Sequence, residues 1–206
     1  MSSELKETGR LEAFSDGVFA FAITLLVLNL RDPTLDPLNQ KSLFEGLLGQ
    51  WTSLFAMITS FATILIMWVN HHNMFTRIQR VDTTFLFLNG LLLFFIVLTP
   101  FTTQLVATHV GLDQTSDGRT AAALYSGVFL LLGIAWTAAG RYTFTKRLAA
   151  REEQRVERRI LIGPVFYAVA FGLSFVSALA SVIVILIIAG FFTIYAREIW
   201  RVTTPS

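Results

Sequence analysis

Long apolar runs separated by short polar segments dominate this sequence and restrict the folds open to it. The runs cover Gly17 to Leu30, Leu43 to Val69, Phe85 to Val106, Ala121 to Ala139 and Ile160 to Tyr195. About 20 apolar residues are enough to cross a bilayer as a helix, and a helix satisfies its own backbone hydrogen bonds in lipid. The sequence therefore predicts an all-α polytopic membrane protein.

The last apolar run determines how many times the chain crosses the membrane. As one helix, its roughly 36 residues would extend about 54 Å, whereas the hydrocarbon core is about 30 Å thick. Small residues gather around Leu179 to Ser181, so we expect a tight turn there between two helices; a single long tilted helix is the alternative. Residues 1–206 are thus predicted to form one domain of six transmembrane helices.

Several boundaries follow from the polar segments. Arg31, Asp32 and Pro33 should end a first helix that begins near Leu11, because proline does not continue a helix. A loop is expected from Asp113 to Arg119, and a charged helical extension from Arg141 to Arg159.

The basic residues indicate the orientation of the chain. With six spans, most of them fall on one side of the membrane, while Arg31, Lys41 and Arg119 fall on the other. Loops on the cytoplasmic side are enriched in Lys and Arg. The sequence therefore predicts that both termini are cytoplasmic.

Composition and motifs argue against other classes of function. The net charge is only +2 and no cysteine is present, so neither a nucleic-acid partner nor a thiolate metal site is expected. His71 and His72 are adjacent and would point about 100° apart on a helix, which disfavours a metal site. The H-E-x-x-H and G-x-S-x-G motifs are absent as well. We predict no enzyme activity, no metal and no cofactor.

Polar residues near the expected cytoplasmic ends of the first three spans are candidates for a connected network, since a charge at membrane depth is costly unless it is paired. They are Asp16, Asn70, His71, His72, Asn73, Asp82 and Asn89. Two other interpretations remain open. Ser15 or Asp16 could cap the start of the first helix, and the whole set could be an interfacial polar girdle.

One face of the first helix is free of charge. At 100° per residue, Gly17, Leu25 and Leu28 lie within about 40° of Phe21, and Thr24 lies within about 60°. This face could surround an axis shared by several subunits. Ordinary packing against lipid or protein would explain the same pattern.

Three segments carry a resemblance to a known family. R-L-E-A-F-S-D at Arg10 to Asp16 resembles the R-x-x-x-F-S-D signature of the transmembrane protein 175 family of potassium channels. The resemblance continues through W-V-N-H-H-N-M-F-T-R-I-Q-R-V-D at Trp68 to Asp82 and through Leu88 to Thr103.

The resemblance implies a bacterial or archaeal plasma-membrane protein, in contact with lipid, whose homotetramer conducts monovalent cations. It implies a potassium-selective or potassium-preferring channel without a T-V-G-Y-G filter, in which the first helix lines the pore. The implied constriction residues are Phe21, Thr24, Leu25 and Leu28. The implied structural network beside the pore comprises Arg10, Phe14, Ser15, Asp16, His71, His72, Asn73 and Asp82. Phe21 departs from the Ile or Leu usual in the family. A secondary transporter and a non-conducting scaffold are the alternative functions.

Overall fold

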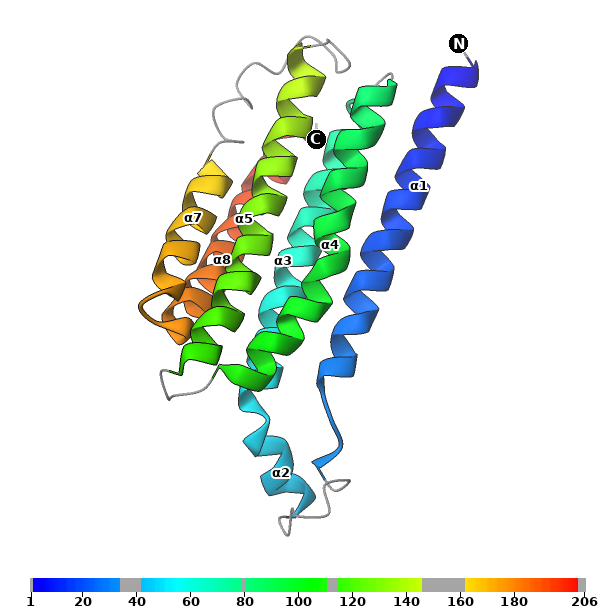
Figure 1. Ribbon diagram of the computed structural model, residues 1–206. Coiled ribbons are helices and arrows are strands. Elements are labelled where there is room, and N and C mark those ends of the chain that lie inside the picture. The colour runs from blue at the N-terminus through cyan, green and yellow to red at the C-terminus, as the bar shows by residue number, and fades with distance from the viewer. Residues whose placement is uncertain (1, 34–41, 79–80, 111–114, 146–161, 204–206) are drawn as a thin grey trace.

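A computed structural model describes residues 2–33, 42–78, 81–110, 115–145 and 162–203. The secondary-structure elements in these ranges are all helices, which confirms the all-α prediction (Figure 1). They are α1 (Ser2–Leu25), the 3-10 helix η1 (Leu26–Asn29), α2 (Leu43–Gly49), α3 (Trp51–Phe75), α4 (Thr83–His109), α5 (Ser116–Thr145), α7 (Ile162–Ser174) and α8 (Ala178–Thr203).

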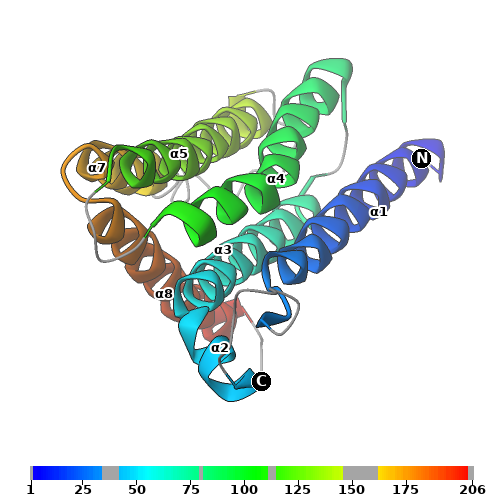
Figure 2. The same ribbon diagram turned by 60° about the horizontal axis from the view of Figure 1, so that its bottom comes forward.

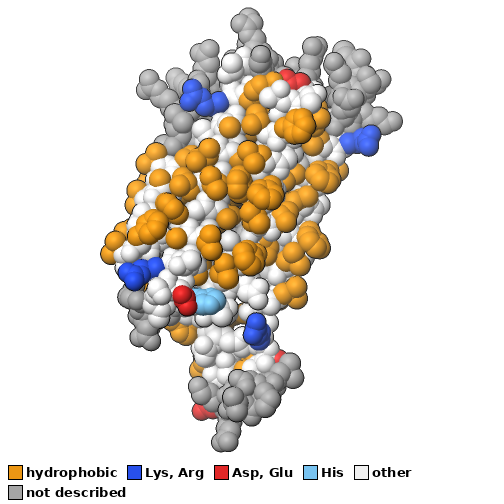
Figure 3. All heavy atoms as spheres, in the orientation of Figure 1, with side chains coloured by type: hydrophobic (Ala, Val, Ile, Leu, Met, Phe, Trp, Pro, Cys, Tyr) orange, Lys and Arg blue, Asp and Glu red, His pale blue; other side chains and the backbone are white. Residues whose placement is uncertain are grey.

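Four helical segments in the described ranges are long and apolar enough to cross a membrane. They are Thr8–Asn29, Trp51–Phe75, Thr83–His109 and Ser116–Thr143, and two shorter apolar helices cover Gly163–Ser174 and Ala178–Phe191. Apolar side chains cover the middle of the face shown in Figure 3, and the charged side chains coloured there lie toward its two ends. The chain is therefore an all-helical membrane protein.

The turn in the last apolar run lies earlier than the sequence predicted. It occupies residues 175–177, and Leu179 to Ser181 belong to α8. Ser177 provides the reason, because its hydroxyl oxygen accepts a hydrogen bond from the backbone N–H of Ala180 at 3.2 Å. A serine at this position caps the free N–H groups of a helix start. The prediction of two helices rather than one is correct.

The second apolar run also divides into two helices, which the sequence analysis did not predict. Ser42 and Glu45 form a capping box at the start of α2, and the chain bends at Gln50 before α3 begins. The side-chain amide of Gln50 exchanges two hydrogen bonds with the backbone of Arg31, at 2.9 and 2.7 Å. This contact ties the start of α3 to the segment that follows η1.

Two further boundaries differ from the predictions. The first helix begins at Ser2 rather than near Leu11, so capping of its start by Ser15 or Asp16 is wrong. The loop predicted from Asp113 ends earlier, because α5 begins at Ser116. The predicted extension after Arg141 continues as α5 to Thr145, and its residues 146–159 lie outside the described ranges.

The helices surround a core centred on α3, α4 and α5. Helix α5 packs against α4, α7 and α8, while α3 packs against α4 and α8. The hydroxyl of Ser60 lies 2.7 Å from that of Thr103 and 2.8 Å from that of Tyr125, which joins these three central helices. Helix α1 packs only against α3, α4 and η1 among the more extensive helix contacts, and Figure 2 shows it at the edge of the bundle.

Candidate functional site

Helix α1 has one buried face and one exposed face. Ser15, Phe19 and Ala22 of α1 and Leu26 of the following η1 are all at most 1% exposed, on the side that meets α3 and α4. On the other face, Phe14, Phe21 and Leu28 are 63%, 60% and 69% exposed. Large apolar side chains thus remain uncovered along the length of this helix.

The exposed side chains of α1 follow a regular spacing. Phe14, Gly17, Phe21, Thr24 and Leu28 are all exposed, and their separations alternate between three and four residues. A mean spacing of about 3.5 residues keeps a stripe facing a partner helix that lies nearly parallel. We call these five residues the α1 stripe. Leu25, which the sequence placed on the same face, is half-buried at its edge.

Thr24 is the residue of the α1 stripe that carries a polar side chain. Its hydroxyl donates a hydrogen bond to the backbone carbonyl of Phe21 at 2.8 Å. The hydroxyl proton is therefore occupied, and the oxygen lone pairs remain able to accept. Two residues later, the α-helix tightens into η1 at Leu26.

Two residues of α1 form hydrogen bonds with aromatic residues of α3. The indole N–H of Trp68 donates to Oδ1 of Asp16 at 2.8 Å. Nδ1 of His72 lies 3.0 Å from Oε1 of Glu12, and the rings of Trp68 and His72 stack with centroids 6.2 Å apart. Both carboxylates of this part of α1 are therefore held by the same turn of α3.

Asn89 of α4 connects α1 to α3 inside the bundle. Its amide nitrogen donates to the Ser15 hydroxyl at 3.0 Å, and its Oδ1 lies 2.8 Å from Nε2 of His71. Because Oδ1 can only accept, this hydrogen bond requires a proton on Nε2 of His71. His71 is fully buried, and its Nδ1 has no hydrogen-bond partner among the described residues.

The other residues predicted for the network lie elsewhere. Arg10 is exposed, and Phe14 belongs to the α1 stripe. The backbone carbonyl of Asn73 accepts a hydrogen bond from the Thr76 hydroxyl at 2.9 Å.

Asp82 caps the start of α4 and makes its hydrogen bonds with residues other than those around Asp16. Its Oδ1 accepts from the backbone N–H of Phe85 at 2.9 Å, and its Oδ2 accepts from the hydroxyl of Tyr142 at 2.6 Å. Asp82 thereby joins the start of α4 to the end of α5.

Glu12 and Trp68 belong to the contacts around Asp16, although neither was predicted to do so. Helical spacing offered a signal for both, because Glu12 precedes Asp16 by four residues and Trp68 precedes His72 by four. Asn70, which was expected to join these contacts, instead lines a cavity on another side of α3. Within the described ranges, no three His, Asp or Glu residues lie close enough together to hold a metal ion.

Comparison with known proteins assigns the chain to a family. Residues 10–100 match the family described as endosomal/lysosomal potassium channel TMEM175. A potassium channel of Chamaesiphon minutus is 43% identical over 93% of this chain and 96% of its own length. A potassium channel of Streptomyces collinus is 39% identical over 84% of this chain and 85% of its own.

A solved structure agrees with these sequence matches. The crystal structure described as a lysosomal potassium-selective channel TMEM175 homolog from Chamaesiphon minutus superposes with a TM-score of 0.83, at 42% identity, and covers 92% of this chain and 98% of that chain. The helices and the contacts described above thus define an all-helical protein of a membrane-channel family. The chain belongs to the TMEM175 family.

Proposed function

We propose that this protein is a potassium-preferring channel whose pore is lined by α1 from four identical subunits. The observation that carries the proposal is the α1 stripe, on which Phe14, Phe21 and Leu28 are each at least 60% exposed. A face repeating every 3.5 residues suits close packing of like helices around an axis. The two relatives named as potassium channels match 93% and 84% of the chain, at 43% and 39% identity.

The proposed gate is a ring of apolar side chains at Phe21, followed by Leu28 in η1. A narrow apolar constriction excludes water, and an ion cannot shed its hydration shell there without replacement oxygens. Slight widening of the ring would admit water and then partly hydrated cations. Leu25 is half-buried, so it would shape the wall beside Phe21 rather than project to the axis.

Thr24 is proposed to add selectivity beside this gate. Since its hydroxyl proton is donated to the Phe21 carbonyl, four Thr24 oxygens could turn lone pairs toward a passing cation. Potassium loses water more readily than sodium, so a short ring of hydroxyl oxygens favours potassium to a moderate degree.

Six spans complete the proposed topology. The apolar helices Gly163–Ser174 and Ala178–Phe191 pack against each other and against α5, and we propose that they cross the membrane as a pair. Both termini are then cytoplasmic in the plasma membrane, and Arg31 and Arg119 lie on the outer side, as the distribution of basic residues indicates.

The test is ion flux from liposomes that contain the purified protein, with potassium inside and sodium outside. A channel gives potassium efflux that is driven by the gradient alone and sustains a diffusion potential. A transporter would need a coupled substrate and would saturate, and a scaffold would give no flux.

Phe21→Ala tests the gate within the same assay. Removing four rings from the constriction should raise potassium flux and leak several-fold, because the apolar narrowing widens. Phe175→Ala is the matched control, since Phe175 is 59% exposed in the turn between α7 and α8, away from α1. Lower flux in Phe21→Ala than in the control would remove Phe21 from the gate.

A further inference from the structure

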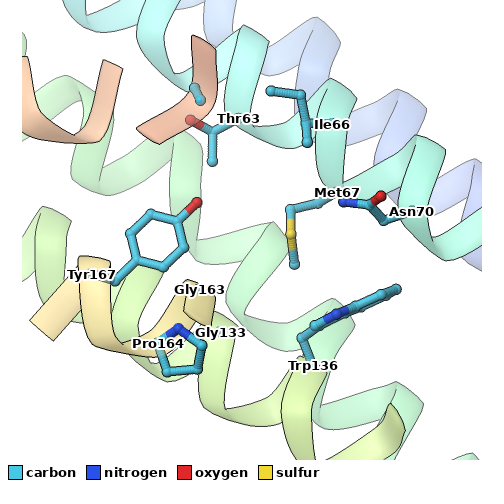
Figure 4. A pocket seen from close by; sticks show the side chains of 10 residues that line it. Thr63, Ile66, Met67, Asn70, Gly133, Trp136, Gly163, Pro164 and Tyr167 are labelled. Carbon is cyan, nitrogen blue, oxygen red and sulfur yellow. The ribbon is translucent and has the colours of Figure 1, made fainter. Parts of the chain in front are cut away.

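A cavity lies on the side of α3 that does not face α1. Its walls come from α3, α5, α7 and α8, and its volume is about 60 Å³. Figure 4 shows it, and the residues that matter here are Thr63, Met67, Asn70, Trp136, Tyr167 and Ala189. Trp68 bonds to Asp16 and His71 bonds to Asn89, and neither lines this cavity, so the cavity is a separate feature of the fold.

Two polar groups in the cavity wall have no hydrogen-bond partner among the described residues. Tyr167 is only 6% exposed, and its hydroxyl points toward Thr63 (Figure 4). The Asn70 amide lies on the far side of Met67. Thr63 donates its own proton to the carbonyl of Thr59 at 2.8 Å, which leaves its oxygen able to accept. A buried hydroxyl without a partner is costly, so Tyr167 favours an occupant that forms hydrogen bonds, and the half-buried Asn70 amide offers a second polar group.

The volume of the cavity limits the size of that occupant. A water molecule needs about 10–15 Å³ of cavity volume. A cavity of about 60 Å³ therefore holds about four waters or an organic molecule of about four non-hydrogen atoms. The engineered cavity that binds benzene is about 150 Å³, so an aromatic ring is too large. Met67 and Ala189 make part of the wall apolar, which favours an alkyl group over a fully polar molecule.

We propose that this cavity is a binding site for short-chain alcohols of up to about four non-hydrogen atoms. The ligand hydroxyl donates to or accepts from Tyr167 and Asn70, and its alkyl chain lies against Met67 and Ala189. Water occupies the cavity when no alcohol is present. The proposal is independent of ion conduction, because it concerns a different side of α3.

Methionine methyl groups give a direct measurement of binding. The chain has four methionines, and Met67 lines the cavity whereas Met57 and Met74 do not. The full chain in lipid nanodiscs, with ¹³C-labelled methionine methyls, is titrated with ethanol, 1-propanol and 1-hexanol. The Met67 signal should shift and saturate with 1-propanol, and ethanol should bind about fourfold more weakly because it has one methylene fewer.

Chain length separates binding in the cavity from partitioning into lipid. In lipid, 1-hexanol partitions more strongly than 1-propanol, whereas it exceeds the cavity and should give no saturable Met67 shift. Tighter apparent binding of 1-hexanol than of 1-propanol would overturn the proposal. So would Met67 shifts that rise without saturation together with those of Met57 and Met74.

Substitutions in the cavity wall test whether the Tyr167 hydroxyl binds the alcohol. Tyr167→Phe should weaken 1-propanol binding two- to tenfold through the loss of one hydrogen bond, and Ala189→Leu should abolish it by filling the cavity. Tyr125→Phe is the control, because that buried hydroxyl bonds to Ser60 and does not line the cavity. Unchanged Met57 and Met74 signals show that a variant is folded. Unchanged 1-propanol affinity in folded Tyr167→Phe overturns the proposal.

Discussion

Asn89 offers the sharpest test of how the polar contacts hold α1. It is 1% exposed, and its side chain bonds to Ser15 of α1 at 3.0 Å and to His71 of α3 at 2.8 Å. Asn89→Leu keeps the branching and the number of non-hydrogen atoms of the side chain and removes both hydrogen bonds. Its two methyl groups are bulkier than the amide, so the polar effect has to be separated from packing by a second variant.

The expected loss of stability follows from what each partner retains. Ser15 still donates to the carbonyl of Leu11 at 2.9 Å, so it loses only a bond that it accepts. His71 loses the partner of its N–H, and its Nδ1 already has none among the described residues. An unsatisfied buried donor costs about 1–3 kcal/mol, and one hydrogen bond between membrane helices averages about 0.6 kcal/mol. We expect Asn89→Leu to destabilise the fold by about 2 kcal/mol.

A second substitution distinguishes this explanation from a simple packing defect. His71→Phe preserves ring contacts with Phe75 and Phe19, whose centroids lie 4.5 and 5.2 Å from that of His71. When both members of a buried pair become apolar, no polar group is left unsatisfied. Asn89→Leu combined with His71→Phe should therefore be more stable than Asn89→Leu alone.

The measurement is the free energy of unfolding by sodium dodecyl sulfate in mixed micelles, at one fixed protein concentration because the proposed assembly would make stability depend on concentration. The four proteins of this cycle give the interaction energy between the two positions. If the losses of the two single variants simply add in the double variant, the hydrogen bond between His71 and Asn89 contributes nothing and the reasoning fails.

Substitutions at three further positions test other parts of the structure. Thr24→Ala should lower the permeability ratio of potassium to sodium while current persists, and Thr24→Ser should restore it, as bi-ionic reversal potentials would reveal. Trp68→Phe should lower the yield of assembled protein on size-exclusion chromatography, because Asp16 loses its indole donor at 2.8 Å; an unchanged yield would show that this bond is dispensable. Ser42→Ala removes the capping box of α2 and should cost about 1 kcal/mol, seen as faster amide hydrogen exchange in residues 43–49 but not in α4.

The helical fold was predictable because its signal is long-range and redundant. Each apolar run extends over many residues, so a misjudged boundary does not change the type of element. Boundaries depend on single capping residues, and these were misjudged. Ser177 rather than the small residues at 179–181 starts α8, and Ser42 with Glu45 starts a helix that hydropathy alone joined to α3.

The contacts of the site were only partly predictable for a different reason. Helical periodicity shows which residues of one helix share a face, but it does not show which face of another helix they meet. Asn70 and His71 are neighbours in sequence, yet Asn70 lines a cavity with α5 and α7 while His71 is buried against Asn89. Asp82 was grouped with Asp16 by depth alone, although its side chain bonds to Phe85 and Tyr142.

The polar contacts of α1 form, and the α1 stripe stays exposed, only at one rotation of α1 about its own axis. In lipid, an apolar helix gains little from turning one apolar face rather than another toward its neighbours, because lipid tails are as apolar as leucine. Hydrogen bonds depend on direction, and Ser15 and Asp16 lie about 100° apart around the helix. Their bonds to Asn89 and Trp68, on α4 and α3, therefore fix the rotation of α1 from two sides. A slip by one residue would turn the helix by about 100°, break both bonds and carry Phe21 off its exposed face.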